Sequence, residues 1–379
     1  MNFKKVDEFL DGLIGTLVPS NDLIVMQDHK CLHRHICGYA DFEEKIPVAE
    51  DALYFMYSAT KPVTCAAVML LHERGLFALD DPLYEYLPEF RDMTVAFTDT
   101  DGKRKTRPAR THITVRHLLT MTAGLDYNIG AAPLRAAREA TAPECTTREI
   151  VRAIAKSPLS FDPGTRWQYG LCHDVLVAFA EVLCGMPFRD FVKANFFEPL
   201  GMKDSYFWYD EEMLRRIVPQ YMYYDADEEF RKVKKENEYI FGTRYDSGGG
   251  GMISCTEDMA RFADMMASGG TTTDGHRILR PETIRLMYTN MLTPELMPDF
   301  NWDQYRGYGY GLGVRTLITH DTGALSSIGE FGWAGAAGAY IMCDPVEKLS
   351  VFCSRQMLNN KEPFITPRLR NLVYECINE

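Results

Sequence analysis

The sequence has no long apolar run, no recognisable secretion signal and no excess of positive charge. Its first apolar patch, Phe9–Val18, is interrupted by Asp11 and shows no cleavage site of the signal-peptide kind. No other run approaches the ~20 apolar residues that a membrane-spanning helix needs. Lys and Arg number 41 against 53 Asp and Glu, so the net charge is -12, which argues against nucleic acid or an anionic membrane as partner. We therefore expect a cytoplasmic protein without a membrane span that acts on a small molecule.

The chain also lacks internal repeats, low-complexity tracts and disordered linkers. Its 379 residues exceed a typical single core and favour two lobes. One basic run, Lys103–Lys105, follows Asp99, Asp101 and Gly102, which is typical of a solvated hairpin tip rather than of a binding surface. These features leave the oligomeric state open.

Ten cysteines occur without a secretion signal, which indicates a reducing compartment and free thiols. Cys31, His33, His35 and Cys37 alternate along a segment that is predicted to be one strand of a hairpin. Residues two apart on a strand lie ~6.6 Å apart, so the outer pair would be ~20 Å apart. These four groups cannot surround one zinc ion at ~2.0–2.3 Å, and we interpret them as one face of a sheet. The sequence therefore predicts neither a metal site nor a cofactor.

Strand patterns occur at both ends of the chain, and helix patterns fill the middle. Predicted strands lie at 23–27, 31–38, 53–56, 308–314, 329–334, 338–343 and 349–354, and predicted helices at 3–17, 113–125, 131–142, 147–156, 173–183 and 188–195. The fold class is therefore α/β (α+β), an antiparallel sheet built from both termini and flanked by helices, with an inserted helical lobe. We expect residues 1–59 and 245–379 to form the sheet lobe, residues 60–244 to form the mainly helical lobe, and the active site to lie in the cleft between them.

The central motif is Ser58 followed three residues later by Lys61, at the start of an apolar segment of helix formers that Gly75 closes. Positions i and i+3 share one face of a helix, so the Lys61 amine can reach the Ser58 hydroxyl. A serine needs an adjacent base to act as a nucleophile, and burial lowers the pKa of a lysine toward the range of such a base. The same spacing also occurs by chance, as a capping serine with a solvated lysine, so the motif needs support from the rest of the chain.

Three further features support it. Tyr169 follows a Pro-Gly turn just before an apolar helix, the glycine run Gly248–Gly251 precedes another helix, and Trp333–Ala336 lies on a late strand with small residues after the aromatic. Together with Ser58 and Lys61 they resemble the serine β-lactamase and penicillin-binding-protein superfamily. The resemblance covers nearly the whole chain. Segments 56–64 and 113–125 are most similar to the class C-related esterases and transesterases of that superfamily.

The resemblance implies a β-lactamase/transpeptidase-like fold and a role for each motif residue. Ser58 would be the acylated nucleophile, and Lys61 with Tyr169 would remove and return its proton. The backbone N–H groups of Ser58 and Ala336 would form the oxyanion hole, the pair of donors that stabilises the tetrahedral intermediate. Gly335 suits this arrangement because a small residue lets the backbone approach a substrate closely.

Two motifs depart from the family pattern. The second often reads Y-x-N, but Leu171 stands where the asparagine is expected, and the third begins with Trp333 instead of Lys or His. These changes remove donors that would hold the carboxylate and the acyl amide of a β-lactam. We interpret Trp333 as a pocket wall and expect Trp333, Gly335 and Leu171 to contact substrate. Arg355, on the following strand, is the one alternative source of the missing cation.

The sequence thus predicts a serine hydrolase, a carboxylesterase or acyl transferase that acts on a small ester through an acyl-enzyme. A class C-type β-lactamase and a D-amino-acid peptidase are the alternatives among enzymes, and a catalytically silent ligand-binding relative is the alternative of another class. Such a relative is expected to lack Ser58, Lys61 or Tyr169, and all three are present. The natural ester and its acyl length stay open. The aromatic residues at 206–209 and 221–224 fit an acyl or alcohol pocket as well as they fit packing.

Overall fold

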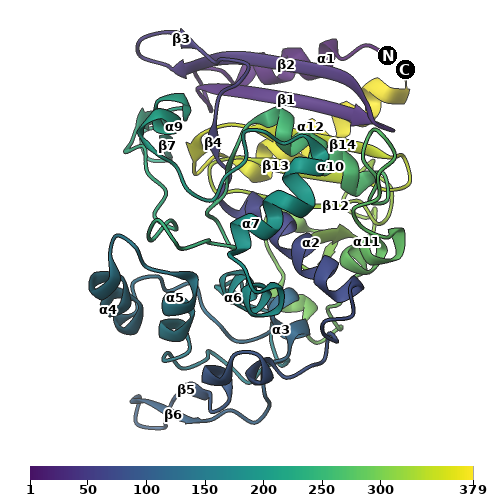
Figure 1. The fold of residues 1–379 in the computed structure, drawn as a ribbon. Helices are drawn as coiled ribbons and strands as arrows, with labels where there is room; N and C mark the ends of the chain where they lie inside the picture. Colours follow the sequence, from purple (N-terminus) through teal and green to yellow (C-terminus); the bar gives the residue numbers. More distant parts are fainter. Residues whose placement is uncertain (379) are drawn as a thin grey trace.

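A computed structural model describes residues 1–378, and its centre is one eight-stranded antiparallel sheet (Figure 1). Strands from the two ends of the chain meet in it, because β1 pairs with β14 from Asp22↔Ser354 to Gln27↔Leu349. This confirms the predicted fold class. In sheet order the strands are β10 (Tyr308–Tyr310), β11 (Arg315–Leu317), β12 (Phe331–Ala334), β13 (Tyr340–Asp344), β14 (Leu349–Ser354), β1 (Ser20–Gln27), β2 (Lys30–Asp41) and β3 (Ile46–Pro47).

Different helices cover the two faces of the sheet, because successive side chains of a strand point to opposite faces. Leu23 and Val25 of β1 pack with the two terminal helices, whereas Ile24 between them packs in a second core with two helices from the interior of the chain. The terminal helices are α1 (Lys4–Leu13) and α12 (Glu362–Asn378), and the interior helices are α2 (Thr60–Glu73) and α10 (Thr256–Ala267).

The middle of the chain is rich in helices, as predicted. Thr114 and Thr146 each cap a helix by accepting the backbone N–H of the third residue beyond. Helix α1 is shorter than predicted, and the N-cap of α10 is Cys255, whose thiol accepts the Asp258 N–H. The remaining helices are α3 (Val115–Leu119), α4 (Ala132–Thr141), α5 (Thr147–Ile154), α6 (Cys172–Cys184), α7 (Phe188–Val192), α8 (Glu198–Leu200), α9 (Glu211–Arg216) and α11 (Pro281–Tyr288).

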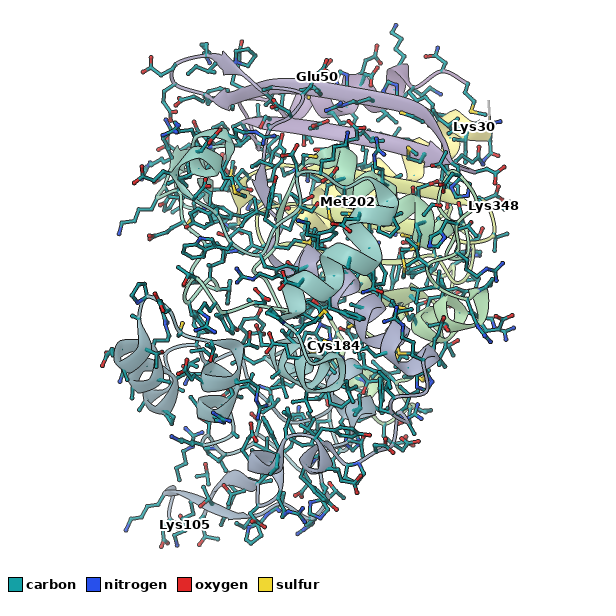
Figure 2. All side chains as sticks on the ribbon, in the orientation of Figure 1. Lys30, Glu50, Lys105, Cys184, Met202 and Lys348 are labelled. Atoms are coloured by element: carbon teal, nitrogen blue, oxygen red, sulfur yellow. The ribbon has the colours of Figure 1, made fainter. Side chains whose placement is uncertain are left out.

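The middle segment also contains two hairpins. The first joins β5 (Thr94–Thr98) to β6 (Arg104–Pro108), and the basic run lies at its exposed tip, where Lys105 extends into solvent (Figure 2). The second joins β7 (Tyr221–Tyr224) to β8 (Glu229–Lys232), and β7 pairs in parallel with β15 (Met357–Leu358). The second hairpin therefore attaches to one strand of the C-terminal segment, β15.

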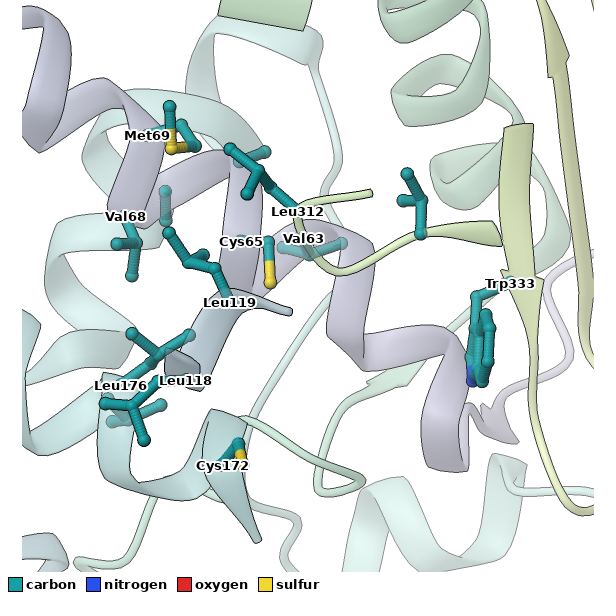
Figure 3. Close-up of a cluster of buried hydrophobic side chains, with 14 of the residues drawn as sticks. Val63, Cys65, Val68, Met69, Leu118, Leu119, Cys172, Leu176, Leu312 and Trp333 are labelled. Carbon is teal, nitrogen blue, oxygen red and sulfur yellow. The ribbon is translucent and has the colours of Figure 1, made fainter. Parts of the chain in front are cut away.

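Helix α2 is enclosed on all sides. Every residue from Thr60 to Leu71 is buried, because apolar residues surround the helix instead of forming one stripe. Figure 3 shows Val68 of α2 in one buried cluster with Leu118 of α3 and Leu176 of α6. This packing fixes the start of α2, where the central motif lies. Within residues 1–378, no helix combines the length and the apolar character that crossing a membrane requires.

A buried ion pair lies near the β10 edge of the sheet. The Nη2 atom of Arg315 is 2.9 Å from Oε1 of Glu330, and the two side chains are 2% and 0% exposed. Arg315 also donates to the Ile341 carbonyl at 3.2 Å, and Tyr308 donates to the second oxygen of Glu330. Because both charges are removed from water, each depends on the other for its solvation.

We expect Glu330→Ala to lower the free energy of unfolding by about 3–5 kcal/mol, since it leaves the buried Arg315 charge without its partner. Chemical denaturation followed by circular dichroism measures the change. Glu229→Ala is the matched control, because Glu229 pairs with Arg231 at an exposed site, and its transition midpoint should stay at the wild-type value. Equal midpoints for the two variants would contradict the assignment.

Candidate active site

Ser58 stands in a short turn between a strand and the central helix. Strand β4 (Tyr54–Phe55) pairs with β9 (Ile253–Ser254) and delivers the chain to a 3₁₀ turn over Tyr57–Ala59, after which α2 begins. Tyr57 has a φ of 45°, a left-handed conformation that is costly for an aromatic residue. Its hydroxyl donates to Oε1 of Gln220 at 2.6 Å. The residue before Ser58 is thus held in a strained conformation, as is common next to reacting groups.

The Lys61 amine lies among three oxygen atoms. Its Nζ is 2.6 Å from the Gly249 carbonyl, 3.2 Å from Ser58 Oγ and 3.4 Å from the Tyr127 hydroxyl. The side chain is fully buried. Burial lowers the pKa of Lys61 to about 7, and the Asp174 carboxylate only partly opposes this shift.

A pKa near neutrality gives this amine a lone pair at working pH. A protonated lysine offers three donors and no acceptor, whereas the neutral amine can donate to Gly249 and accept the proton of the Ser58 hydroxyl. The 3.2 Å separation from Ser58 Oγ is within the reach of a general base, for which geometry comes before pKa. The arrangement can therefore generate a serine nucleophile at neutral pH.

Tyr169 completes the group. Its hydroxyl accepts a hydrogen bond from Trp333 Nε1 at 3.2 Å, and its ring lies 4.4 Å from Lys61 Nζ. Burial raises the pKa of Tyr169, although its hydrogen bonds with Ser58 and Trp333 favour the phenolate. At neutral pH the phenol therefore keeps its proton while Lys61 is poised to lose one. The structure thus brings together Ser58, Lys61 and Tyr169 from segments more than a hundred residues apart.

The segment that follows β12 lies against the chain just before Ser58. A Cβ atom on Gly335 would be 2.2 Å from the Met56 carbonyl oxygen, so only glycine allows this approach. The Gly335 N–H donates to Ala339 at 2.7 Å, and Asn360 donates to the Ala336 carbonyl at 3.1 Å. The Gly338 N–H donates to the Gly335 carbonyl at 2.8 Å and fixes the peptide between them. That peptide carries the Ala336 N–H, which stays our predicted oxyanion-hole donor together with the Ser58 N–H.

The glycine run forms the opposite side of the site. The Gly248 carbonyl accepts the Thr64 hydroxyl at 3.0 Å, one helical turn beyond the Gly249 contact of Lys61. A Cβ atom on Gly248 would lie 2.5 Å from the His173 carbonyl, and one on Gly249 would lie 2.5 Å from the Asp174 carboxylate. Glycine at these positions lets the backbone reach the buried amine.

Two predicted substrate contacts, Trp333 and Leu171, and the alternative cation Arg355 are all buried in this structure, and their contact with substrate stays a prediction. Trp333 is 1% exposed, and its indole N–H is used by Tyr169, so it orients the phenol from within the core (Figure 3). Leu171 is buried at the start of α6 and lines a small hollow beside Leu125, on the side of the helical core. Arg355 is also buried and donates to Asn21 at 2.8 Å, so its guanidinium already has a partner. A motif position cannot reveal which way a side chain turns.

Tyr127 is the residue that sequence reasoning missed. Its hydroxyl lies next to Lys61, its ring stacks on Tyr169 at 5.4 Å, and Tyr239 packs edge-on against it at 5.3 Å. Only its place just after the 113–125 segment could have drawn attention to it. The sequence left open whether the aromatic residues at 206–209 and 221–224 line a pocket or serve packing. Tyr221 and Tyr223 serve packing, because they are buried against the terminal helices.

We expect kcat/KM for an uncharged ester to rise with pH and to reach half its plateau near pH 7, because Lys61 must lose its proton to accept that of Ser58. A pH–rate profile measures this. Lys61→Arg keeps a charge that titrates far above this range, and should abolish the rise together with most of the activity. A half-maximum near about pH 4 would point to a carboxylate base instead.

Lys61 and Tyr169 should act as one unit, so their losses should not add. We expect Lys61→Ala and Tyr169→Phe each to lower kcat by about 10²–10⁴-fold, and the double variant to lose little more than the worse single variant. Steady-state kinetics on one ester tests this. Tyr206→Phe, which removes a hydroxyl bonded to Lys203 and Asp204, is the control and should keep wild-type kcat. Full activity in Tyr169→Phe would remove the tyrosine from the mechanism.

The chain is similar to known proteins over most of its length. A family model described as Beta-lactamase matches residues 6–373. Esterase EstB of Burkholderia gladioli is 30% identical over 372 residues, covering 93% of this chain and 89% of its own. Acyltransferase calJ of Penicillium decumbens is 27% identical over 348 residues, covering 86% and 80%.

Solved structures share the fold. Unliganded simvastatin synthase (LovD) of Aspergillus terreus superimposes with a TM-score of 0.82 at 22% identity, over 100% of both chains. The match of the family model over nearly the whole chain, together with the 30% identity to EstB, settles the relationship. This chain belongs to the beta-lactamase family.

Proposed function

We propose that this protein is a serine hydrolase that works through an acyl-enzyme at Ser58, as a carboxylesterase or acyl transferase on a small ester. The observation that carries the proposal is the buried Lys61 amine, with its pKa lowered to about 7, at 3.2 Å from Ser58 Oγ. A lysine in this state can take a proton from a serine, which a solvated lysine at neutral pH cannot do.

The reaction follows from the positions of these groups. The Ser58 oxygen attacks the ester carbonyl carbon while its proton passes to Lys61. The resulting oxyanion accepts hydrogen bonds from the backbone N–H groups of Ser58 and Ala336. The bond to the leaving alcohol then breaks, and the alcohol departs with the proton, returned through Lys61 and Tyr169. Water or a second alcohol then attacks the acyl carbon, and Lys61 and Tyr169 pass its proton back to the Ser58 oxygen as the acyl bond breaks. Water releases an acid, and an alcohol releases a new ester.

Charge near the site favours a neutral substrate. Two buried arginines, Arg315 on β11 and Arg355 just after β14, are both engaged, the first by Glu330 and the second by Asn21. Neither can turn toward the carboxylate of a β-lactam or a D-alanyl peptide without losing its partner, and an uncompensated carboxylate in a desolvated site is costly. A neutral ester meets no such penalty beside the aromatic rings of Tyr127 and Tyr169, which lie next to Lys61.

The relatives support both outcomes of the second step, since one is named an esterase and another an acyltransferase. Which outcome dominates here depends on whether an alcohol competes with water for the acyl-enzyme. A silent binding relative is disfavoured, because Ser58, Lys61 and Tyr169 are all present and in contact.

We expect a short-chain aryl ester to be turned over with a higher kcat/KM than a chromogenic cephalosporin, because the cephalosporin carries a carboxylate that finds no free cation. Adding a primary alcohol and quantifying the new ester by mass spectrometry separates hydrolysis from acyl transfer. A higher value for the cephalosporin would establish the β-lactamase alternative, and turnover of a D-alanyl amide above the ester would establish the peptidase.

The acyl-enzyme is tested separately with an active-site phosphonate and intact-protein mass. The wild type should gain one phosphonyl adduct and Ser58→Ala none. Labelling that persists in the alanine variant would exclude Ser58 as the nucleophile.

A further inference from the structure

A group of imidazoles and carboxylates lies between α1 and β2, on the face of the sheet covered by the terminal helices. In the β1–β2 register His33 stands opposite Val25 and His35 opposite Leu23, so both imidazoles share the side of the sheet on which α1 packs. Helix α1 places Asp7 and Asp11 one turn apart and therefore on one face. The helix and the strand thus bring two histidines and two aspartates together.

Three of these side chains converge on one point. Oδ1 of Asp7 lies 2.6 Å from His33 Nε2 and 3.4 Å from His35 Nδ1, and one ligand atom from each of the three falls within 4.8 Å of the others. Ligands bound tetrahedrally to zinc at ~2.0–2.1 Å lie ~3.4 Å apart. The Asp7–His35 distance already has this value, and the Asp7–His33 distance needs to open by less than ~1 Å.

The second ring nitrogen of His35 pairs with a carboxylate, as is usual for a histidine that binds a metal. Its Nε2 lies 2.8 Å from Oδ1 of Asp11. A histidine that binds a metal usually donates its other ring N–H to a carboxylate, which fixes the tautomer and the ring orientation. Here Asp11 would fix the N–H on Nε2 and leave the Nδ1 lone pair directed toward Asp7.

The other imidazole is oriented by packing. The Phe3 ring stacks on His33 with centroids 4.7 Å apart and an interplanar angle of 4°. The side chains of His33, His35 and Asp7 are 19%, 20% and 30% exposed, so the group is sheltered but still reached by water. Two imidazoles, one carboxylate and an accessible fourth position form a donor set that suits zinc.

The strand alone could not have indicated this site. Cys31, His33, His35 and Cys37 lie along β2, as the sequence predicted, and a register shift at Val25/Met26 falls between Cys31 and His33. The missing ligand comes from α1, which is more than twenty residues away in the chain.

We propose that Asp7, His33 and His35 bind one zinc ion, with water as the fourth ligand and Asp11 as the hydrogen-bond partner of His35. The ion would tie α1 to β2. It lies across the sheet from the core that contains α2, so its role is structural and separate from the chemistry at Ser58.

Isothermal titration of the chelator-treated full-length protein with zinc chloride tests the proposal. We expect one site in the wild type, no binding in His35→Ala, and about 10–100-fold weaker binding in Asp11→Asn, the usual effect of removing such a partner. His29→Ala is the matched control, since His29, in the turn between β1 and β2, also pairs with an aspartate, Asp264 of α10. It should bind zinc like the wild type.

Two further measurements keep the outcome decisive. Zinc should raise the melting temperature of the wild type, because it binds only the folded state, and should leave that of Asp7→Asn unchanged even if His35→Ala folds poorly. Ester turnover should be the same with and without zinc. Absence of zinc binding in the wild type, or equal loss in His29→Ala and His35→Ala, would overturn the proposal.

The competing ligand set is Asp11, His35 and Cys37. Cobalt substitution separates the two sets, since a thiolate ligand adds an intense charge-transfer absorption that the proposed set lacks. Loss of binding in Cys37→Ser with normal binding in Asp7→Asn would overturn the proposed ligands.

Discussion

The rest of the structure depends on one buried amine next to one serine hydroxyl. Moving a charged ammonium out of water costs several kcal/mol even after relaxation, so the fold must either pair Lys61 or keep it neutral. The protein does the latter: the amine meets a carbonyl and two hydroxyls, and its pKa falls to about 7. The desolvation that makes this lysine unfavourable as a cation is also what suits it to the proposed role of a base.

Keeping the amine buried explains several features that otherwise look unrelated. Helix α2 is apolar all round because it carries Lys61 through the middle of the core. Gly248 and Gly249 let a backbone carbonyl replace water around the amine, and Gly335 lets the end of β12 approach the chain before Ser58. Each glycine stands where a single Cβ atom would collide with backbone or with a buried side chain.

Aromatic side chains form the remaining surroundings of the site. Tyr127 and Tyr169 stack on each other beside Lys61, and the indole N–H of Trp333 donates a hydrogen bond to the Tyr169 hydroxyl. This arrangement holds the phenol in place without adding charge. Together with the engagement of Arg315 and Arg355 elsewhere, it leaves the environment of Ser58 better suited to neutral esters than to anionic amides.

The sequence by itself determined the fold class, the family and the pairing of Ser58 with Lys61. The last of these follows from a local rule, since residues three apart on a helix must share a face. Only the tertiary structure decided what depends on segments that meet from far apart. In the structure the Tyr127 hydroxyl lies beside Lys61, and the Trp333 indole donates to Tyr169 inside the core. Leu171 is buried, and Arg355 donates a hydrogen bond to Asn21. Asp7 of α1 also lies against the histidines of β2. The spacing of residues along β2 could not indicate this contact, because it contains no information on the helix that packs on the strand.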